Sequence, residues 1–116
     1  MNATQTPWHE HFNMFDYITQ ELPELIQHHF NTNGKQSVMG HSMGGHGALM
    51  LALRQPDHYQ SVSAFAPIVS PADVPWGQKA FAAYLGEDTS LWQQYDSCAL
   101  LKKANTFIPA LVDQGT

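Results

Sequence analysis

The sequence predicts an α/β fold in which parallel strands alternate with crossover helices. Three short apolar segments bounded by turn residues are typical of buried strands, at residues 36–39, 61–66 and 107–112. The intervals between them carry helical patterns, as expected for a parallel sheet covered by helices. Both intervals also exceed the roughly dozen residues that a crossover between parallel strands needs.

An amphipathic helix is predicted over residues 14–30, ahead of the first strand. Its apolar side chains recur at helical spacing, at Phe15, Ile18, Leu22, Leu25 and Ile26. Pro23 lies inside this segment and has no backbone N–H, so we expect a kink there or two short helices in tandem. The turn-forming run 31–34 ends the helix.

The strand at 36–39 leads into a glycine-rich turn and then into a second helix. That helix is predicted over residues 44–54, where small and apolar side chains indicate close packing on one side. Pro56 ends it. The strand at 61–66 follows and is short and apolar, as buried parallel strands are.

The remaining elements are a loop, two helices and the last strand. Residues 68–75 are proline-rich and loop-like, and a helix follows over 76–85 with Gly86 as its C-cap. Asp88 begins a group of polar residues that can cap another short helix. The apolar run 107–112 completes the sheet.

The composition is that of a globular protein, and it excludes several functions. The 116 residues are 43% hydrophobic and 13% charged, which argues against disorder. Only five Lys and Arg residues stand against ten Asp and Glu, so no basic patch is expected that could bind nucleic acid or an anionic membrane. The longest apolar stretches fall far short of the roughly 20 residues that a membrane-spanning helix needs. We predict neither a nucleic-acid nor a membrane partner.

Cysteine and histidine usage bears on compartment and metal binding. Cys98 is the only cysteine and cannot form an internal disulfide, and no secretory signal pattern is recognised. A reducing cytoplasm therefore fits best. The seven histidines match none of the ligand spacings of zinc sites, so we predict no metal site.

The motif with chemical meaning is G-x-S-x-G, formed by Gly40, His41, Ser42, Met43 and Gly44. It follows a predicted strand and precedes a predicted helix, which is the context of a nucleophile elbow. The central residue of such a turn takes a strained backbone conformation, and we expect Gly40 and Gly44 to let strand and helix approach each other. A chance match would mark only an ordinary glycine-rich turn, but the flanking strand and helix favour the catalytic interpretation.

The predicted turn would place the Ser42 hydroxyl clear of the sheet. A serine hydroxyl is a weak nucleophile at neutral pH, so it must meet a histidine base. The helix begins at once, so its backbone N–H groups face the position of a developing oxyanion. We expect the Met43 N–H to be one oxyanion donor.

Beyond this motif, the whole chain resembles the S-formylglutathione hydrolases, also called esterase D, of the α/β-hydrolase fold. The matching segments are residues 2–5, 7–8, 21–23, 40–49, 61–68, 75–81, 84–86 and 113–115. The resemblance implies a cytoplasmic serine thioesterase that hydrolyses S-formylglutathione to glutathione and formate in formaldehyde detoxification, without a metal or organic cofactor. It also implies that Trp8 and Trp76 line the acyl or glutathione pocket.

The same resemblance implies that residues 1–116 form a single partial α/β-hydrolase domain. In the family, N-terminal strands carry the second oxyanion donor and a C-terminal segment carries the catalytic acid and base, and this sequence holds neither. Asp113 is expected to be a neighbour of the acid, which would follow a few residues later. His41 and His46 are not expected to reach the Ser42 hydroxyl as substitute bases.

Other interpretations stay open on the sequence. The polypeptide could be a non-catalytic truncated remnant or an interaction module. It could also belong to a related carboxylesterase or acyltransferase that uses the same turn. The isolated chain is expected to be inactive or nearly so, and the sequence does not define its oligomeric state.

Overall fold

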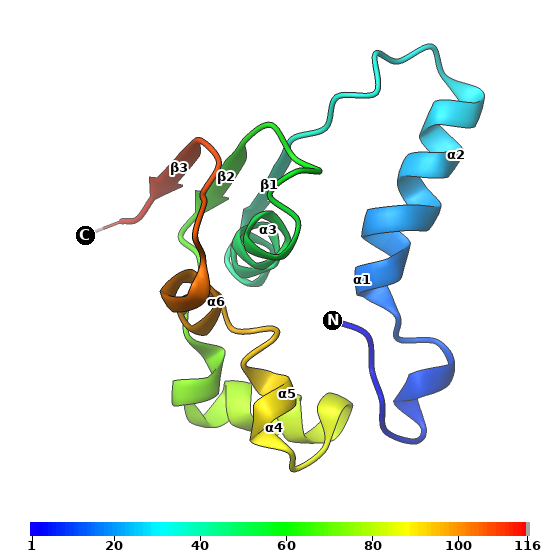
Figure 1. The fold of residues 1–116 in the computed structure, drawn as a ribbon. Helices are drawn as coiled ribbons and strands as arrows, with labels where there is room; N and C mark the ends of the chain where they lie inside the picture. The colour runs from blue at the N-terminus through cyan, green and yellow to red at the C-terminus, as the bar shows by residue number, and fades with distance from the viewer. Residues whose placement is uncertain (116) are drawn as a thin grey trace.

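The computed structural model describes residues 1–115. Three strands, β1 (Val38–His41), β2 (Val62–Phe65) and β3 (Ala110–Asp113), pair in parallel in the order β1-β2-β3 (Figure 1). The predicted α/β class with parallel strands is therefore confirmed. β1 lies later in the chain than the strand predicted at 36–39. Gly40 and His41, expected in the turn, belong to it because they pair with Ala64 and Phe65 of β2.

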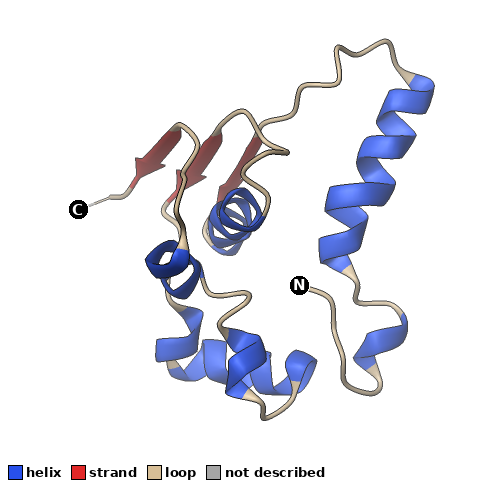
Figure 2. Cartoon of the chain, viewed as in Figure 1, coloured by secondary structure: helices blue, strands red, loops and turns tan. Residues whose placement is uncertain are grey.

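One helix provides most of the packing against this sheet. α3 (Met43–Arg54) lies across β1 and β2, as Figure 2 shows. Its buried residues Ala48, Leu49 and Ala52 form a core cluster with Val62 and Ala64 of β2. The small alanine side chains on both elements allow the helix to approach the sheet closely.

The N-terminal helical run is continuous, although it contains Pro23. Its parts are α1 (Met14–Asp16), the π-helical η2 (Tyr17–Glu21) and α2 (Leu22–His29). The N–H of Leu22 donates to the Tyr17 carbonyl, which closes a π turn directly before Pro23. Proline cannot supply the N–H of an α-helical bond, and the wider turn accommodates that loss. The disturbance expected at Pro23 therefore takes the form of a π turn within one run.

Two short helices and a longer one lie below the sheet in Figure 1. They are α4 (Pro75–Leu85), α5 (Thr89–Trp92) and α6 (Ser97–Lys103). Gly86 ends α4 with a φ of 83°, and Asp88 caps α5, as predicted. α6 is absent from the sequence prediction, as are the 3₁₀ turns η1 (Trp8–Glu10) and η3 (Pro71–Asp73).

Aromatic side chains attach the N-terminal segment to the rest of the chain. The Trp8 ring lies 5.2 Å from the Phe12 ring and 5.5 Å from the Tyr84 ring of α4, measured between centroids. At the other end of the segment, the Arg54 guanidinium of α3 lies 4.2 Å from the centroid of the Phe15 ring and 4.8 Å from that of Tyr95. Such stacked cations are attracted by the ring faces.

The sheet face opposite α3 is uncovered among residues 1–115. Side chains alternate between the faces of a strand, so the register places Met39, Ser63 and Leu111 together on that face. Met39 is 71% exposed and Leu111 is 55% exposed. Every residue of β3 is exposed. Parallel sheets are normally covered on both faces, and this face exposes apolar side chains instead.

Candidate active site

Ser42 lies at the turn between β1 and α3, where it is the N-cap of the helix. Its φ of 56° and ψ of −116° are outside the regions that non-glycine residues favour. The Ser42 N–H donates to the Phe65 carbonyl at 2.9 Å, and the Ser42 carbonyl accepts from His46 N–H at 3.0 Å and Ile68 N–H at 3.3 Å. A strained residue persists only where its surroundings fix it, and these three bonds hold it from β2, from α3 and from the loop after β2.

Glycines allow this turn to close, but not the pair that was predicted. A Cβ atom on Gly40 would lie 2.2 Å from the Gly44 carbonyl oxygen, a distance that no side chain tolerates. A Cβ on Gly45 would lie 3.0 Å from the Pro67 Cβ. A Cβ on Gly44 would meet no atom of the described residues within 4 Å. The strand and the helix do approach each other at Gly40 and Gly44, but the helix residue that must lack a side chain is Gly45, which faces Pro67 and the Gly40 carbonyl, and not Gly44 as predicted.

Met43 is the first residue of α3, and its side chain is 71% exposed. The first intrahelical bond is made by the His46 N–H, so the Met43 N–H precedes the bonded part of the helix. It also lies at the positive end of the helix dipole. Both properties suit an oxyanion donor, and that role of Met43 stays a prediction.

The two histidines nearest Ser42 differ in their surroundings. His41 ends β1 and is exposed, and the strand alternation directs its side chain to the face opposite Gly40. His46 is largely buried, and its Nε2 has no hydrogen-bond partner within residues 1–115. Burial lowers the pKa of His46, with the Asp96 carboxylate and the Tyr95 backbone opposing that shift. Neither ring is hydrogen-bonded to Ser42 in the described chain, so the expectation that neither serves as a base stands untested.

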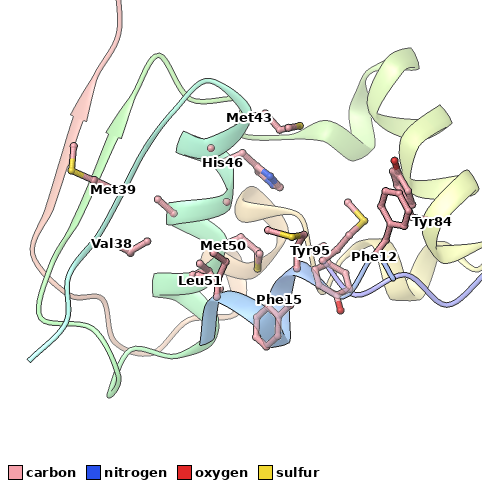
Figure 3. A pocket seen from close by; sticks show the side chains of 16 residues that line it. Phe12, Phe15, Val38, Met39, Met43, His46, Met50, Leu51, Tyr84 and Tyr95 are labelled. Atoms are coloured by element: carbon pink, nitrogen blue, oxygen red, sulfur yellow. The ribbon is translucent and has the colours of Figure 1, made fainter. Parts of the chain in front are cut away.

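A cavity of about 500 Å³ lies beside the first turns of α3. Figure 3 shows His46 projecting from the helix into it, with Phe12 and Tyr84 on the far side. Met43 and Gly44 also line it, so it reaches the turn at Ser42. Its wall is mostly apolar, which suits neither a metal ion nor a charged ligand.

The two tryptophans predicted as pocket residues differ in their distance from the cavity beside α3, since Trp8 packs on its lining residues Phe12 and Tyr84. Trp8 packs in the aromatic cluster with Phe12 and Tyr84, and Trp76 is half exposed in the first turn of α4. Neither lines the cavity beside α3 in the part of the chain that the structure describes. A role of Trp8 and Trp76 in substrate binding stays a prediction.

The end of each strand contributes to one edge of the sheet. Ser42 follows β1, Ala66 follows β2 and Asp113 ends β3, with the Ala66 N–H donating to the Asp113 carbonyl at 2.6 Å. In parallel α/β sheets, ligands bind outside the carboxyl ends of the strands. The residues that follow Asp113 thus begin at the same edge as Ser42.

Comparisons with known proteins support this geometry. The model of the Esterase family matches residues 1–116. The chain belongs to the Esterase family. Among solved structures, this Esterase-family chain is 47% identical to an S-formylglutathione hydrolase from Agrobacterium tumefaciens, with a TM-score of 0.94 over 100% of its own length. The predicted resemblance to these hydrolases is therefore confirmed.

Two Staphylococcus aureus structures are more distant. A fluorophosphonate-binding serine hydrolase is 27% identical over 86% of this chain, with a TM-score of 0.70. An S-formylglutathione hydrolase is 26% identical over 95% of it, with a TM-score of 0.68. The present chain spans only 42% of the Agrobacterium protein, and 43% and 46% of the two staphylococcal ones.

Two kinds of feature are absent from the described residues 1–115. No helix in residues 1–115 has the length and apolar content to cross a membrane. Over the same residues, no three or more His, Cys, Asp or Glu side chains are grouped as metal ligands would be.

Sequence reasoning missed the buried Asp96 and its contacts with two separate segments. Asp96 is 2% exposed, and its carboxylate binds both the start of α6 and the loop after β2. An Asp directly before Ser97 is a recognisable N-cap signal and could have predicted α6. The contacts with the loop join residues far apart in the sequence, and no local pattern predicts them.

Proposed function

We propose that this chain carries the nucleophile of a serine thioesterase that hydrolyses S-formylglutathione to glutathione and formate, with Ser42 as the nucleophile. The observation that carries the proposal is the strained backbone of Ser42, at φ 56°, between the parallel strand β1 and the N-terminus of α3. The G-x-S-x-G motif needs this strand–turn–helix context to be catalytic. The substrate class rests on the likeness to the Agrobacterium hydrolase.

The geometry suggests how the reaction would proceed. The Ser42 Oγ attacks the formyl carbon while a histidine base takes its proton, and the carbonyl oxygen becomes an oxyanion. The Met43 N–H and the positive end of α3 stabilise that charge. The tetrahedral intermediate then expels the glutathione sulfur, which takes the proton from the histidine, and Ser42 retains the formyl group. Water hydrolyses this ester by the reverse proton transfers and releases formate.

The base, the acid and the second oxyanion donor are assigned to segments of the family that this chain does not contain. We therefore propose that residues 1–116 are one part of an α/β-hydrolase domain and are inactive alone. In a complete enzyme they would act in formaldehyde detoxification in the cytoplasm, where the Cys98 thiol would stay reduced.

The test uses a family-length chimera, in which this chain replaces the matching segment of the Agrobacterium hydrolase. We expect the chimera to hydrolyse S-formylglutathione and to be labelled covalently by a fluorophosphonate, and the Ser42→Ala variant to do neither above background. Removing the nucleophile of a serine hydrolase costs on the order of 10⁶ in kcat. Ser63→Ala, a serine substitution in neighbouring β2, is the matched control and should retain activity.

Three other outcomes would decide against this proposal. Labelling of Ser42 with turnover of p-nitrophenyl esters but not of S-formylglutathione would indicate a carboxylesterase. Transfer of the formyl group to an added alcohol or thiol in preference to water would indicate an acyltransferase. A folded chimera with neither labelling nor turnover would favour the non-catalytic interpretation.

A further inference from the structure

The loop after β2 is hydrogen-bonded to the Ser42 backbone, and several of its own backbone groups are hydrogen-bonded to other segments. Ala66 begins it with a φ of 42°, and two residues later the Ile68 N–H donates to the Ser42 carbonyl at 3.3 Å. Of the three hydrogen bonds to the Ser42 backbone, this one alone comes from a loop. The position of Ile68 therefore depends on what holds the loop.

The start of α6 binds this loop on one side. The Val69 carbonyl accepts from the Ser97 hydroxyl at 2.6 Å and from the Cys98 N–H at 3.2 Å. The Asp96 carboxylate reaches further along the loop. Its Oδ2 accepts from the Ala72 N–H at 3.1 Å. The Ser70 hydroxyl lies 3.4 Å from the same oxygen, but it donates its single proton to Asp73 Oδ2 at 2.5 Å.

The two carboxylate oxygens of Asp96 have different partners. Oδ2 binds the loop, whereas Oδ1 accepts from the Ala99 N–H at 2.9 Å and caps α6. Asp96 is 2% exposed, so these bonds are made away from water. Hydrogen bonds to an ionised acceptor are stronger than those between neutral groups, and a buried charge needs all of them.

α4 holds the opposite side of the loop. A Cβ atom on Gly77 would lie 2.1 Å from the Pro71 carbonyl oxygen, so helix and loop are in direct backbone contact. The Gln78 Nε2 also donates to the Ala72 carbonyl at 2.9 Å. The loop is thus fixed between two helices and cannot shift without breaking several bonds.

We propose that Asp96 is a positioning residue for Ser42. Its carboxylate fixes the loop at Ala72, the loop fixes the Ile68 N–H, and that N–H holds the carbonyl of the strained serine. The inference rests on the proposed function, since Ser42 must be the nucleophile for its orientation to affect a rate. Loosening the loop should misplace the Ser42 hydroxyl, and a displacement of about 1 Å can cost on the order of a hundredfold in rate.

The test is Asp96→Asn in the family-length chimera. Asparagine is isosteric and is a good N-cap, but it offers only one acceptor oxygen, so it cannot satisfy both α6 and the loop. Asp88→Asn is the matched control. Asp88 caps α5 through the same kind of bond, from the Ser90 N–H at 2.9 Å, and it is exposed and remote from the loop.

Three quantities are measured in the parent, Asp96→Asn and Asp88→Asn chimeras. They are the rate constant for fluorophosphonate labelling of Ser42, kcat and KM for S-formylglutathione, and hydrogen exchange of the Ile68 amide. We expect Asp96→Asn to lower the labelling rate and kcat by about tenfold or more, with KM changed less than about twofold. The Ile68 amide should exchange faster. Asp88→Asn should match the parent in all three.

A further variant tests the proposal in case Asp96→Asn does not fold. Ser97→Ala removes the hydroxyl that donates to the Val69 carbonyl and leaves the Asp96 carboxylate in place, so it should lower kcat as well, by a smaller factor. An unchanged labelling rate in folded Asp96→Asn would overturn the proposal. So would a fall that only matches the loss of folded protein measured by circular dichroism.

Failure of the proposed function would be distinguishable from failure of this inference. If the parent chimera is neither labelled nor active, the proposed function is wrong. Exchange of the Ile68 amide still decides on the loop in that case. Faster exchange in Asp96→Asn than in Asp88→Asn supports the link between Asp96 and the Ser42 carbonyl, and equal exchange refutes it.

Discussion

Ser42 and Ala66 occupy equivalent positions on adjacent strands, and both have a positive φ, of 56° and 42°. The pairing of His41 with Phe65 places each of them directly after its strand. No other non-glycine residue among residues 1–115 has a positive φ. The strain in this part of the chain is therefore concentrated at the carboxyl edge of the sheet, where the proposed chemistry takes place.

The conformation of Ala66 leads to a prediction about stability. Ala66→Val places a β-branched side chain at a positive φ and should lower the free energy of unfolding of the family-length chimera by about 1–3 kcal/mol. Ala66→Gly should be nearly neutral, because relief of strain offsets the added freedom of the unfolded chain. Urea denaturation of both variants checks this. Equal effects of valine and glycine would show that the positive φ of Ala66 carries no strain.

The glycines of α3 and β1 allow a matched comparison. Gly40→Ala should destabilise the chimera by about 3 kcal/mol or more, because its methyl group would overlap the Gly44 carbonyl. Gly47→Ala meets nothing within 4 Å in the described chain and lies inside α3, so it should stabilise by about 0.5–1 kcal/mol. Denaturation midpoints of the two variants measure the difference. A well-tolerated Gly40→Ala would contradict the close approach of strand and helix.

The burial of His46 predicts a pH dependence of stability. Burial lowers its pKa below the ordinary value of 6.5, with Asp96 opposing and the N-terminal amine assisting. The unfolded chain therefore takes up the proton more readily than the folded chain, and stability should fall as the pH drops below about 6.5 towards the folded pKa.

Replacing His46 separates its contribution to the pH dependence of stability from that of the other histidines. His46→Gln should flatten the difference in unfolding free energy between pH of about 7.5 and about 5.5, measured by urea denaturation of the chimera. His28→Gln, an exposed change in α2, is the control and should leave the slope as in the parent. An identical slope in His46→Gln and the parent would contradict the burial of a neutral ring.

Arg54 should stabilise the docking of the N-terminal segment. Its guanidinium stacks on Phe15 and Tyr95, and cation–π contacts contribute from about 0.5 to about 2 kcal/mol each as they become desolvated. We expect Arg54→Ala to cost about 1–3 kcal/mol and Phe15→Leu to be coupled to it in a double-mutant cycle. Additive effects of the two substitutions would show that the stacking contributes nothing.

The isolated 116-residue chain should aggregate in solution. The bare sheet face with Met39 and Leu111, together with the exposed strand β3, favours aggregation. Size-exclusion chromatography should show higher assemblies, and hydrolysis of a p-nitrophenyl ester should not exceed that of the Ser42→Ala variant. Turnover that depends on Ser42 would show that His41 or His46 does reach the hydroxyl.

Local patterns predicted those parts of the fold that depend on local chemistry. The parallel strands, α3, α4 with its Gly86 cap and the short helix after Asp88 all follow from apolar spacing and turn residues. The limits of β1 did not, because Gly40 and His41 become strand only through pairing with β2. α6 was missed because its polar N-cap signal at Asp96 stands without a clear apolar period.

The support of the candidate site could be predicted least. The motif identified Ser42 and its turn, but the choice between Gly44 and Gly45 depends on where Pro67 lies, which only the folded chain determines. The hydrogen bond that the Ala72 N–H donates to the Asp96 carboxylate joins residues 24 positions apart. Such contacts produce no periodic pattern in the sequence.

The π turn before Pro23 has a consequence for the helical face of the N-terminal run. An extra residue in one turn advances the phase of all later side chains by about 100° relative to an unbroken α-helix. Phe15, before the turn, and Ile18, within it, pack against the core cluster around Leu51, whereas Leu25 and Ile26, after it, are 54% and 39% exposed. The apolar stripe that looks continuous on a helical wheel is thus two stripes facing different directions, and the second is free for a different neighbour.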